Sequence, residues 1–253
     1  MLCIQDLSMG YNREMVLDSL GFTVQPGEML SILGPNGVGK TTLLRCINRI
    51  LKPSKGAVLV EEENVFRMSV AEIAKRMGYV AQKSEAGRMT VFDAVLLGRK
   101  PHLSWKVSDR DLQIVDATLK RMGLSHMSLR HIDRISGGEL QKVCIARAMV
   151  QEPQVLLLDE PTSSLDLKNQ MEIMRIIRFV LQEHQISVVM TMHDLNMAFR
   201  YTDKFLFLKE GRLYHHGDSR DLTPEMVRQV YGVPVDILDH SGQMVIVPRE
   251  STS

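Results

Sequence analysis

The sequence predicts an α/β fold that combines a mixed, mainly parallel core sheet with an N-terminal antiparallel β part and an inserted helical lobe. Three observations lead to this prediction. Short strand-like runs separated by turn residues fill the first part of the chain, and compact apolar runs recur between residues 29 and 191. A long stretch between two of these runs has no strand pattern. Together they indicate a sheet-centred domain with one helical insertion.

The N-terminal part is predicted to be a mainly antiparallel sheet because its apolar runs are short and alternate with turn residues. The turn signals are Gly10, Pro26-Gly27 and residues 53–56. The strand-like runs beside them are Leu2–Leu7, Val16–Val24 and Val58–Glu62.

The core sheet is predicted to be parallel because its apolar runs are compact and do not alternate. Strands that helices cover on both faces have continuous apolar sequences. The runs of this kind are Met29–Leu33, Gly78–Ala81, Val155–Leu158 and Ser187–Thr191.

Residues 84–152 are predicted to form the helical lobe. Thr90-x-x-Asp93 and Ser108-x-x-Asp111 each resemble a helix start with a capping carboxylate. The chain beyond residue 204 is predicted to form two hairpins with a helix between them. These elements are a hairpin of Phe205–Leu208 with Gly211–His215, a helix from Thr223-Pro224-Glu225 to Gly232, and a hairpin of Val235–Asp239 with Met244–Val247. The pair His215-His216 is expected in a solvated loop.

Length and composition favour one ordinary globular domain over residues 1–253, with its C-terminal helix and hairpin at about 219–248. Lys plus Arg number 31 against 30 Asp plus Glu, without blocks of like charge, so nucleic acid is not an expected partner. No apolar run is long enough to span a membrane, and no export signal is visible. The three cysteines, Cys3, Cys46 and Cys144, have no ligand spacing, so reduced thiols in the cytosol are expected.

The segment after the first core run carries the clearest chemistry. Gly34-Pro35-Asn36-Gly37-Val38-Gly39-Lys40-Thr41 fits the phosphate-binding pattern G-x-x-x-x-G-K-[ST], between a strand and the helical run Thr42–Ile50. Its glycines let backbone N–H groups converge on phosphate oxygens, Lys40 reaches the β- and γ-phosphates, and the Thr41 hydroxyl can ligate Mg²⁺. The alternative is a glycine-rich turn with a solvated lysine, and the flanking strand and helix weigh against it.

Two adjacent carboxylates, Asp159 and Glu160, follow the third core run. Ligands of open α/β sheets bind at the C-terminal ends of the strands. Adjacent strand residues point in opposite directions, so the two carboxylates need not share a role. Asp159 is the candidate Mg²⁺ partner, either as a direct ligand or through another ligand of the ion, and Glu160 is the candidate base for an attacking water. A solvated pair at a strand end is the alternative.

The segment Ile135-Ser136-Gly137-Gly138-Glu139 resembles the signature motif of the ABC ATPases, and it precedes the Asp159-Glu160 strand as in that family. Gln82 matches the family's glutamine loop, Ser164-Leu165-Asp166 its D-loop and His193 its switch histidine, all in family order. Tyr11 resembles the aromatic residue on which adenine stacks. The resemblance covers about residues 1–217, and Glu139 stands where glutamine is usual.

The resemblance implies a P-loop ATPase that uses ATP and Mg²⁺. The implied catalytic residues are Lys40, Gln82, Glu160 and His193, and the implied Mg²⁺ ligands are Thr41, Gln82 and Asp159. The implied ATP contacts are Tyr11, Gly34, Pro35, Asn36, Gly37, Val38, Gly39, Lys40, Thr41, Thr42, Ser136, Gly137, Gly138 and Asp166. In the family the signature motif acts on nucleotide held by the other subunit, so a second copy of the chain is an expected partner.

Three further segments resemble the ATPases of importers for iron-siderophore complexes, haem and cobalamin. They are Leu97–His102, Met192–Ala198 and Leu222–Val233. This resemblance implies a motor subunit that is cytoplasmic and peripheral on the inner face of the membrane. Its implied partners are integral membrane permease subunits and, indirectly, a substrate-binding protein. The helical lobe and the Gln82 loop are expected to form the groove for a permease helix. Residues 99–105 mix basic and apolar side chains near it, or form a solvated loop.

Two alternatives to the importer subunit predict other sequence features. A soluble ABC ATPase acting on nucleic acid or ribosomes should carry a long coiled coil, a tandem ATPase domain or basic extensions, and the sequence has none of these. A P-loop GTPase or kinase predicts neither the Ser136-Gly137-Gly138 turn nor His193, and the guanine-reading sequence N-K-x-D does not occur.

Overall fold

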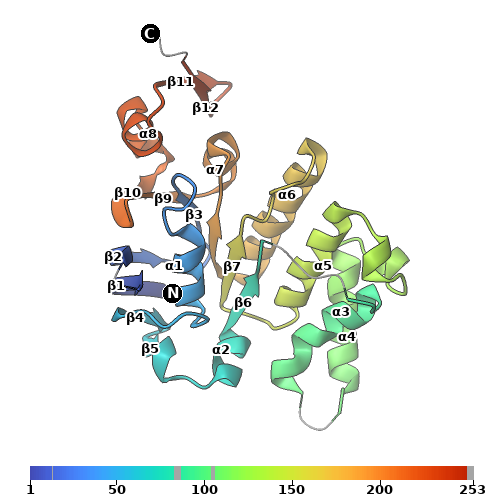
Figure 1. The fold of residues 1–253 in the computed structure, drawn as a ribbon. Helices are drawn as coiled ribbons and strands as arrows, with labels where there is room; N and C mark the ends of the chain where they lie inside the picture. The colour runs from blue at the N-terminus through green and yellow to red at the C-terminus, as the bar shows by residue number, and fades with distance from the viewer. Residues whose placement is uncertain (13, 83–86, 104–105, 250–253) are drawn as a thin grey trace.

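A computed structural model describes residues 1–12, 14–82, 87–103 and 106–249 (Figure 1). The strands are β1 (Leu2–Tyr11), β2 (Glu14–Val24), β3 (Met29–Leu33), β4 (Lys55–Val60), β5 (Glu63–Asn64), β6 (Met77–Val80), β7 (Val155–Asp159), β8 (Ser187–Thr191), β9 (Lys204–Lys209), β10 (Arg212–Asp218), β11 (Val235–His240) and β12 (Gln243–Pro248). The α-helices are α1 (Lys40–Ile47), α2 (Val70–Arg76), α3 (Val91–Leu96), α4 (Asp109–Arg121), α5 (Gly137–Met149), α6 (Leu167–His184), α7 (Leu195–Tyr201) and α8 (Pro224–Tyr231). Short 3₁₀ helices are η1 (Val65–Arg67), η2 (Leu97–His102), η3 (Ser125–Met127), η4 (Ile132–Arg134) and η5 (Ser219–Asp221).

The core sheet has the strand order β10-β9-β3-β8-β7-β6. Neighbouring strands from β9 to β6 pair in parallel, and β10 joins the edge as the antiparallel partner of β9. Every residue of β3, β7 and β8 is buried, as continuous apolar runs predict for strands covered on both faces. The predicted parallel core is therefore confirmed.

The N-terminal sheet, with the order β2-β1-β4-β5, is antiparallel throughout, as predicted. Helix α1 lies between this sheet and the core sheet (Figure 1). Its apolar side chains Leu43, Leu44 and Ile47 belong to the same buried cluster as Leu2 of β1 and Leu30 of β3. Burial of this helix between two sheets fixes the position of the loop that precedes it.

The helical lobe contains α3, α4 and α5; in Figure 1 α3 and α4 lie away from the sheets, whereas α5 packs against β6 of the core sheet. The predicted helix starts are confirmed, since Thr90 caps α3 and Ser108 forms a capping box with Asp111 at α4. Among the described residues of the lobe the strand-like pairing is a single bridge between Thr90 and His131. The fold class predicted from the sequence is therefore confirmed, including the helical insertion.

Arg99 is an exception to the expectation that residues 99–105 face a partner or solvent. Its side chain is only 4% exposed, and it donates to Asp111 Oδ1 at 2.9 Å, to the Val150 carbonyl at 2.6 Å and to Glu152 Oε2 at 2.7 Å. The neighbouring Gly98 allows this approach, because a Cβ there would collide with the backbone of α5. Arg99 thus holds η2, α4 and the end of α5 together. Residues 104 and 105 lie outside the described residues.

The C-terminal segment comprises α8, which begins at the cap Thr223 and ends at Gly232, and the antiparallel hairpin β11–β12. Both elements agree with the sequence prediction. The expectation for His215-His216 is wrong, because both residues lie half-buried in β10. Burial lowers the pKa of His216, and its ring lies 6.3 Å from that of Phe22.

Candidate active site

The loop between β3 and α1 has a backbone that requires glycine. Gly34, Gly37 and Gly39 have φ values of 150°, 80° and 107°. A Cβ on Gly39 would lie 2.7 Å from the Leu17 side chain of β2, so the loop also packs closely against the N-terminal sheet. No side-chain hydrogen bond caps the start of α1 at Gly39, which leaves the N–H groups of its first turn available to an anion.

Lys40 begins α1 and is buried, with 6% of its surface exposed. Its ammonium donates to the carbonyl oxygens of Gly34 at 2.7 Å and Pro35 at 3.0 Å, so the side chain folds back over the loop. Burial lowers the pKa of Lys40, and the nearby carboxylates of Glu160 and Asp159 partly oppose this shift. A partly desolvated cation next to free N–H groups suits a phosphate.

Asp159 ends β7 and is almost fully buried. Its Oδ1 accepts hydrogen bonds from the hydroxyls of Thr41 at 3.0 Å and Thr191 at 2.8 Å. The Thr191 hydroxyl also accepts from the Glu160 N–H at 2.9 Å. Parallel pairing places Asp159 opposite Thr191, so the core sheet itself aligns these groups with the first turn of α1.

Glu160 is the point at which three separated segments meet. One carboxylate oxygen accepts from Gln82 Nε2, which follows β6, and the other pairs with His193 Nε2, which follows β8. The backbone of Glu160 has a φ of 51°, so the chain turns sharply as it leaves β7. This turn directs the carboxylate toward both partners. A cavity of about 160 Å³ is lined here by Asn36, Gly37, Gly39, Lys40, Thr41, Thr42, Glu160 and His193.

The predicted signature residues form a second group at the start of α5. Ser136 caps the helix in a capping box, since its hydroxyl accepts from the Glu139 N–H at 3.3 Å and donates to the Glu139 carboxylate at 2.7 Å. A Cβ on Gly138 would lie 2.7 Å from the side chain of Asn169, which donates to Asp166 at 3.0 Å. Ser136–Gly138 and Asp166 are therefore neighbours, and they do not line the cavity at Lys40.

Tyr11 lies at the end of β1 opposite Glu14, with 45% of its surface exposed. It is not among the residues that line the cavity at Lys40. Its exposure at a strand end leaves part of the ring available for stacking.

Residues that the sequence reasoning missed also shape the site. Thr191 links Asp159 to the Glu160 backbone, Asn169 joins Asp166 to Gly138, and the Tyr231 hydroxyl accepts from the Gly34 N–H at 2.8 Å. Thr191 carried a usable signal, since it ends a buried strand two positions before His193. The other two had none, because their contacts arise only in the folded chain.

The donor set at Thr41 suits Mg²⁺. In the described part of the chain, no group of three or more His, Cys, Asp or Glu side chains could hold a metal ion. Thr41, Asp159 and Gln82 offer a hydroxyl, a carboxylate and an amide, which are hard oxygen donors. Mg²⁺ usually binds through one or two protein oxygens, waters and substrate phosphates, so a small donor set beside a phosphate loop fits this ion.

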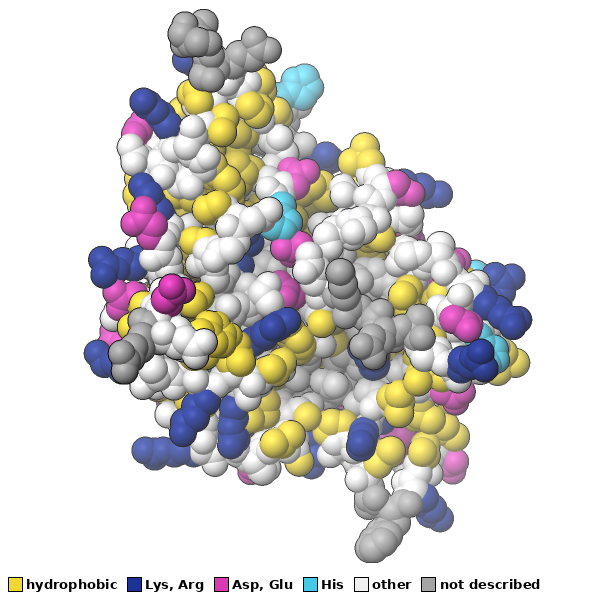
Figure 2. All heavy atoms as spheres, viewed as in Figure 1, with side chains coloured by type: hydrophobic (Ala, Val, Ile, Leu, Met, Phe, Trp, Pro, Cys, Tyr) yellow, Lys and Arg dark blue, Asp and Glu magenta, His cyan; other side chains and the backbone are white. Residues whose placement is uncertain are grey.

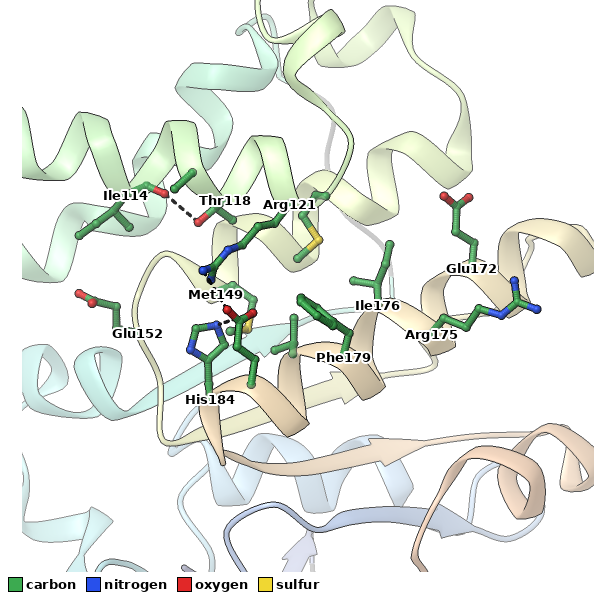
Figure 3. A pocket seen from close by; sticks show the side chains of 14 residues that line it. Ile114, Thr118, Arg121, Met149, Glu152, Glu172, Arg175, Ile176, Phe179 and His184 are labelled. Carbon is green, nitrogen blue, oxygen red and sulfur yellow. Dashed lines mark hydrogen bonds and ion pairs between the residues drawn. The ribbon is translucent and has the colours of Figure 1, made fainter.

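A separate cavity of about 490 Å³ lies between α4 of the lobe and α6 of the core (Figure 3). Ile114 and Thr118 line it from α4, and Ile176 and Phe179 line it from α6. None of the predicted site residues lines this cavity, so it has no part in the site described above.

None of the helices in the described part of the chain combines the length and the hydrophobicity of a membrane-spanning helix.

Comparison with known proteins identifies the family. The family model described as "ABC transporter" matches residues 17–163. An uncharacterised ABC transporter ATP-binding protein of Methanocaldococcus jannaschii is 50% identical over 247 residues, covering 98% of this chain and 97% of that protein. The iron(3+)-hydroxamate import ATP-binding protein FhuC of Bacillus subtilis is 34% identical and covers 94% of this chain and 90% of its own length. The ferric enterobactin transport ATP-binding protein FepC of Escherichia coli is 32% identical, with coverages of 98% and 94%.

Solved structures agree with these relatives. One, described as an inward-facing conformation of a metal-chelate type ABC transporter, has a TM-score of 0.86, 30% identity and coverages of 99% and 98%. Another, a dimeric post-hydrolysis state of an ATP-binding cassette bound to ADP and Pi, has a TM-score of 0.77, 26% identity and coverages of 88% and 100%. The chain therefore belongs to the ABC transporter family, and it is an ATPase of the ABC type.

Proposed function

We propose that this chain is one ATPase domain, residues 1–253, and the motor subunit of an ABC importer. The observation that carries the proposal is the convergence of Lys40, Thr41, Asp159, Gln82 and His193 around Glu160 at the C-terminal ends of the core strands. ATP binds along the loop of residues 34–41 and continues over Thr42. On ATP binding, Lys40 exchanges its loop carbonyls for the β- and γ-phosphate oxygens.

Thr41, Asp159 and Gln82 hold Mg²⁺ in this proposal. The ion neutralises charge on the phosphates and supports their transfer to water. The hydrogen bond from Thr41 to Asp159, 3.0 Å long, already brings two of these oxygens together. Thr191 fixes Asp159 from the other side, so the carboxylate keeps one orientation.

Glu160 orients the attacking water and accepts its proton in this proposal. Gln82 and His193 contact its two carboxylate oxygens, so both set the direction in which the carboxylate points. His193 is the more exposed of the pair, with 44% of its side chain accessible against 11% for Glu160. It therefore lies where it can meet the γ-phosphate from the solvent side of the cavity.

The active form is a head-to-tail dimer with two ATP molecules at the interface. Ser136, Gly137, Gly138 and Asp166 lie together but away from the cavity at Lys40, so they can serve the nucleotide of a second copy. The Ser136 hydroxyl, which is hydrogen-bonded to Glu139 in this chain, and the helix N–H groups at the start of α5 suit a phosphate once that hydroxyl turns toward it. Tyr11 stacks on the adenine at the opposite end of the nucleotide.

Glu160→Gln tests these roles. The variant keeps the size and the hydrogen-bonding capacity of the side chain, so ATP and Mg²⁺ binding should persist while hydrolysis falls by at least roughly a hundredfold. Size exclusion with MgATP should show an accumulated dimer, and the same variant in MgADP should elute as a monomer. Exposed Glu62→Gln is the matched control and should behave as wild type. Native turnover by Glu160→Gln would show that Glu160 is not the catalytic base. The absence of an ATP-dependent dimer would show that the ATP site is not shared between two copies of the chain.

The proposed cargo is an iron-siderophore, haem or cobalamin-type ligand. Support comes from the relatives named for ferric hydroxamate and ferric enterobactin and from the metal-chelate type neighbour. In this proposal the chain acts in the cytoplasm, bound to permease subunits on the inner face of the membrane and linked through them to a substrate-binding protein. Purification in mild detergent should recover a permease with the chain, and uptake of ferric siderophore, haem and cobalamin in a deletion strain should identify the cargo.

The helical lobe offers a docking groove for the permease. A cavity of about 610 Å³ on the lobe is lined by Met89, Asp93, Leu96, Leu97, Lys100, Leu103 and Val107. Figure 2 shows hydrophobic side chains gathered on the lobe on the face in view. Gln82 is not among the lining residues, and residues 83–86 lie outside the described part of the chain. An apolar groove with one acidic side chain, Asp93, and one basic side chain, Lys100, suits a short amphipathic helix.

A further inference from the structure

A hydroxyl from the C-terminal segment reaches the first residue of the phosphate-binding loop. Tyr231, the last residue of α8, accepts a hydrogen bond from the Gly34 N–H at 2.8 Å, although the two residues are 197 positions apart in sequence. Figure 1 shows α8 next to β9 and β10, on the side of the core sheet from which the loop emerges. The contact is therefore made at the edge of the core sheet that β9 and β10 form.

Tyr231 is held in place by its own packing. Its ring meets Phe207 of β9 edge-on, with centroids 6.2 Å apart and an interplanar angle of 79°. Burial raises the pKa of the hydroxyl, so it stays neutral and available as an acceptor at any physiological pH. Thr223 caps α8 at one end, and Gly232 ends it in the left-handed conformation at the other. The helix therefore presents the hydroxyl from a defined position.

Both backbone polar groups of Gly34, its N–H and its carbonyl, have hydrogen-bond partners. Its N–H is taken by Tyr231, and its carbonyl accepts from the Lys40 ammonium at 2.7 Å. A Cβ at this position would lie 2.6 Å from the Leu208 carbonyl oxygen, so β9 also limits where the backbone can pass. One glycine thus connects the C-terminal helix to the lysine of the loop, through two consecutive hydrogen bonds.

The C-terminal segment makes a second contact near the site, in which its hairpin is bonded to α7. Asn196 of α7 accepts from the Ile246 N–H at 2.7 Å and donates to the Ile246 carbonyl at 3.2 Å, which fixes β12 against the helix that follows His193. The C-terminal segment, residues 219–248, is therefore attached both to the phosphate-binding loop and to the helix after His193.

We infer that Tyr231 is a positioning residue of the ATP site, which holds Gly34 and the start of the phosphate-binding loop in the conformation that accepts nucleotide. The inference rests on the proposed roles of the loop and Lys40. Because Tyr231 acts through the loop backbone, it serves ATP and ADP alike and does not touch the hydrolytic step at Glu160. This gives it a kinetic signature different from that of the proposed base.

Tyr231→Phe removes only the hydroxyl and keeps the ring against Phe207. We expect the dissociation constants of MgATP and MgADP to rise together by roughly three- to tenfold, because a buried N–H is left unpaired and the loop must be ordered by the nucleotide. The KM for ATP should rise to the same extent, while kcat stays within about twofold. Tyr214→Phe, at a half-exposed position on β10, is the matched control and should leave all four constants unchanged.

Amide hydrogen exchange at Gly34 provides an independent measurement on the folded protein. The rate should increase in Tyr231→Phe and stay at the wild-type value in Tyr214→Phe, because only the first removes the acceptor. An unchanged exchange rate at Gly34, or wild-type dissociation constants for both nucleotides, would overturn the inference, as would a fall in kcat with KM unchanged. Lys40→Ala separates the two proposals, since nucleotide binding by that variant at wild-type affinity would refute the phosphate site itself whatever Tyr231 does.

Discussion

Glu139 is the residue at which the chain departs from the usual signature motif, and the structure gives this change a physical meaning. Its carboxylate accepts from both the N–H and the hydroxyl of Ser136, and these hydrogen bonds lower the pKa of Glu139. A negative charge at the start of α5 stabilises the helix. In the proposed dimer the same charge faces the triphosphate held by the second copy, where it is repulsive.

Glu139→Gln should therefore favour the ATP-bound dimer. The amide oxygen can still accept from Ser136, so the helix start survives while the charge is removed. On the Glu160→Gln background, half-maximal dimerisation should need roughly two- to fivefold less ATP. Size exclusion over an ATP titration measures this, with exposed Glu62→Gln as the control. An unchanged or higher ATP requirement would show that the Glu139 charge does not face the nucleotide.

At the scale of the secondary structure elements, the helical lobe depends on a charged residue in its interior. Arg99 on η2 contacts the capping carboxylate of α4 and the end of α5, where the Val150 carbonyl accepts from it. Hydrogen bonds from Ser108, together with the Arg99 guanidinium, hold the pKa of Asp111 down to about 2. The Leu97–His102 segment is thus a structural connection inside the lobe, and only some of its residues can meet a partner.

Arg99→Leu should destabilise the lobe, because it leaves Asp111 without its buried partner. We expect the thermal midpoint to fall by roughly 5 to 10 °C, measured by calorimetry without nucleotide. Arg110→Leu, at an exposed position in the first turn of α4, is the matched control and should shift the midpoint by less than about 2 °C. Equal midpoints for the two variants would mean that the Arg99 contacts contribute no net stability.

Local sequence signals explain why some helix starts could be predicted and why one short helix was missed. The caps at Thr90, Ser108 and Ser136 lie within three residues of their partners, so each helix start is visible in the sequence. Helix α2 has an equivalent capping box at Ser69, but it spans only seven residues and buries only Ile73. So short a helix with one buried side chain shows no periodicity, and the cap alone did not identify it.

At the scale of the whole molecule, the proposed docking groove makes the lobe the point of contact with the permease. Leu97→Arg should disrupt co-purification of the permease, because it places a charge in the groove at a position that is already 51% exposed and tolerates it. ATP binding by the purified subunit should stay unchanged. Leu129→Arg, on the same lobe and 80% exposed but outside the groove, is the control and should retain the permease. Retention of the permease by Leu97→Arg would place the docking site elsewhere.

The sequence alone was sufficient for the fold class and for proposing the site residues whose chemistry depends on their immediate neighbours. The phosphate-binding loop is recognisable because its glycines, Lys40 and Thr41 must be adjacent to wrap one phosphate group, and Asp159-Glu160 because a buried strand ends there. The tertiary structure decided which distant groups meet. Tyr231 bonds to Gly34, Arg99 is buried in the lobe, and His216 is half-buried in β10. These contacts depend on how the sheets and helices pack, and that packing is a property of the whole chain that no short motif records.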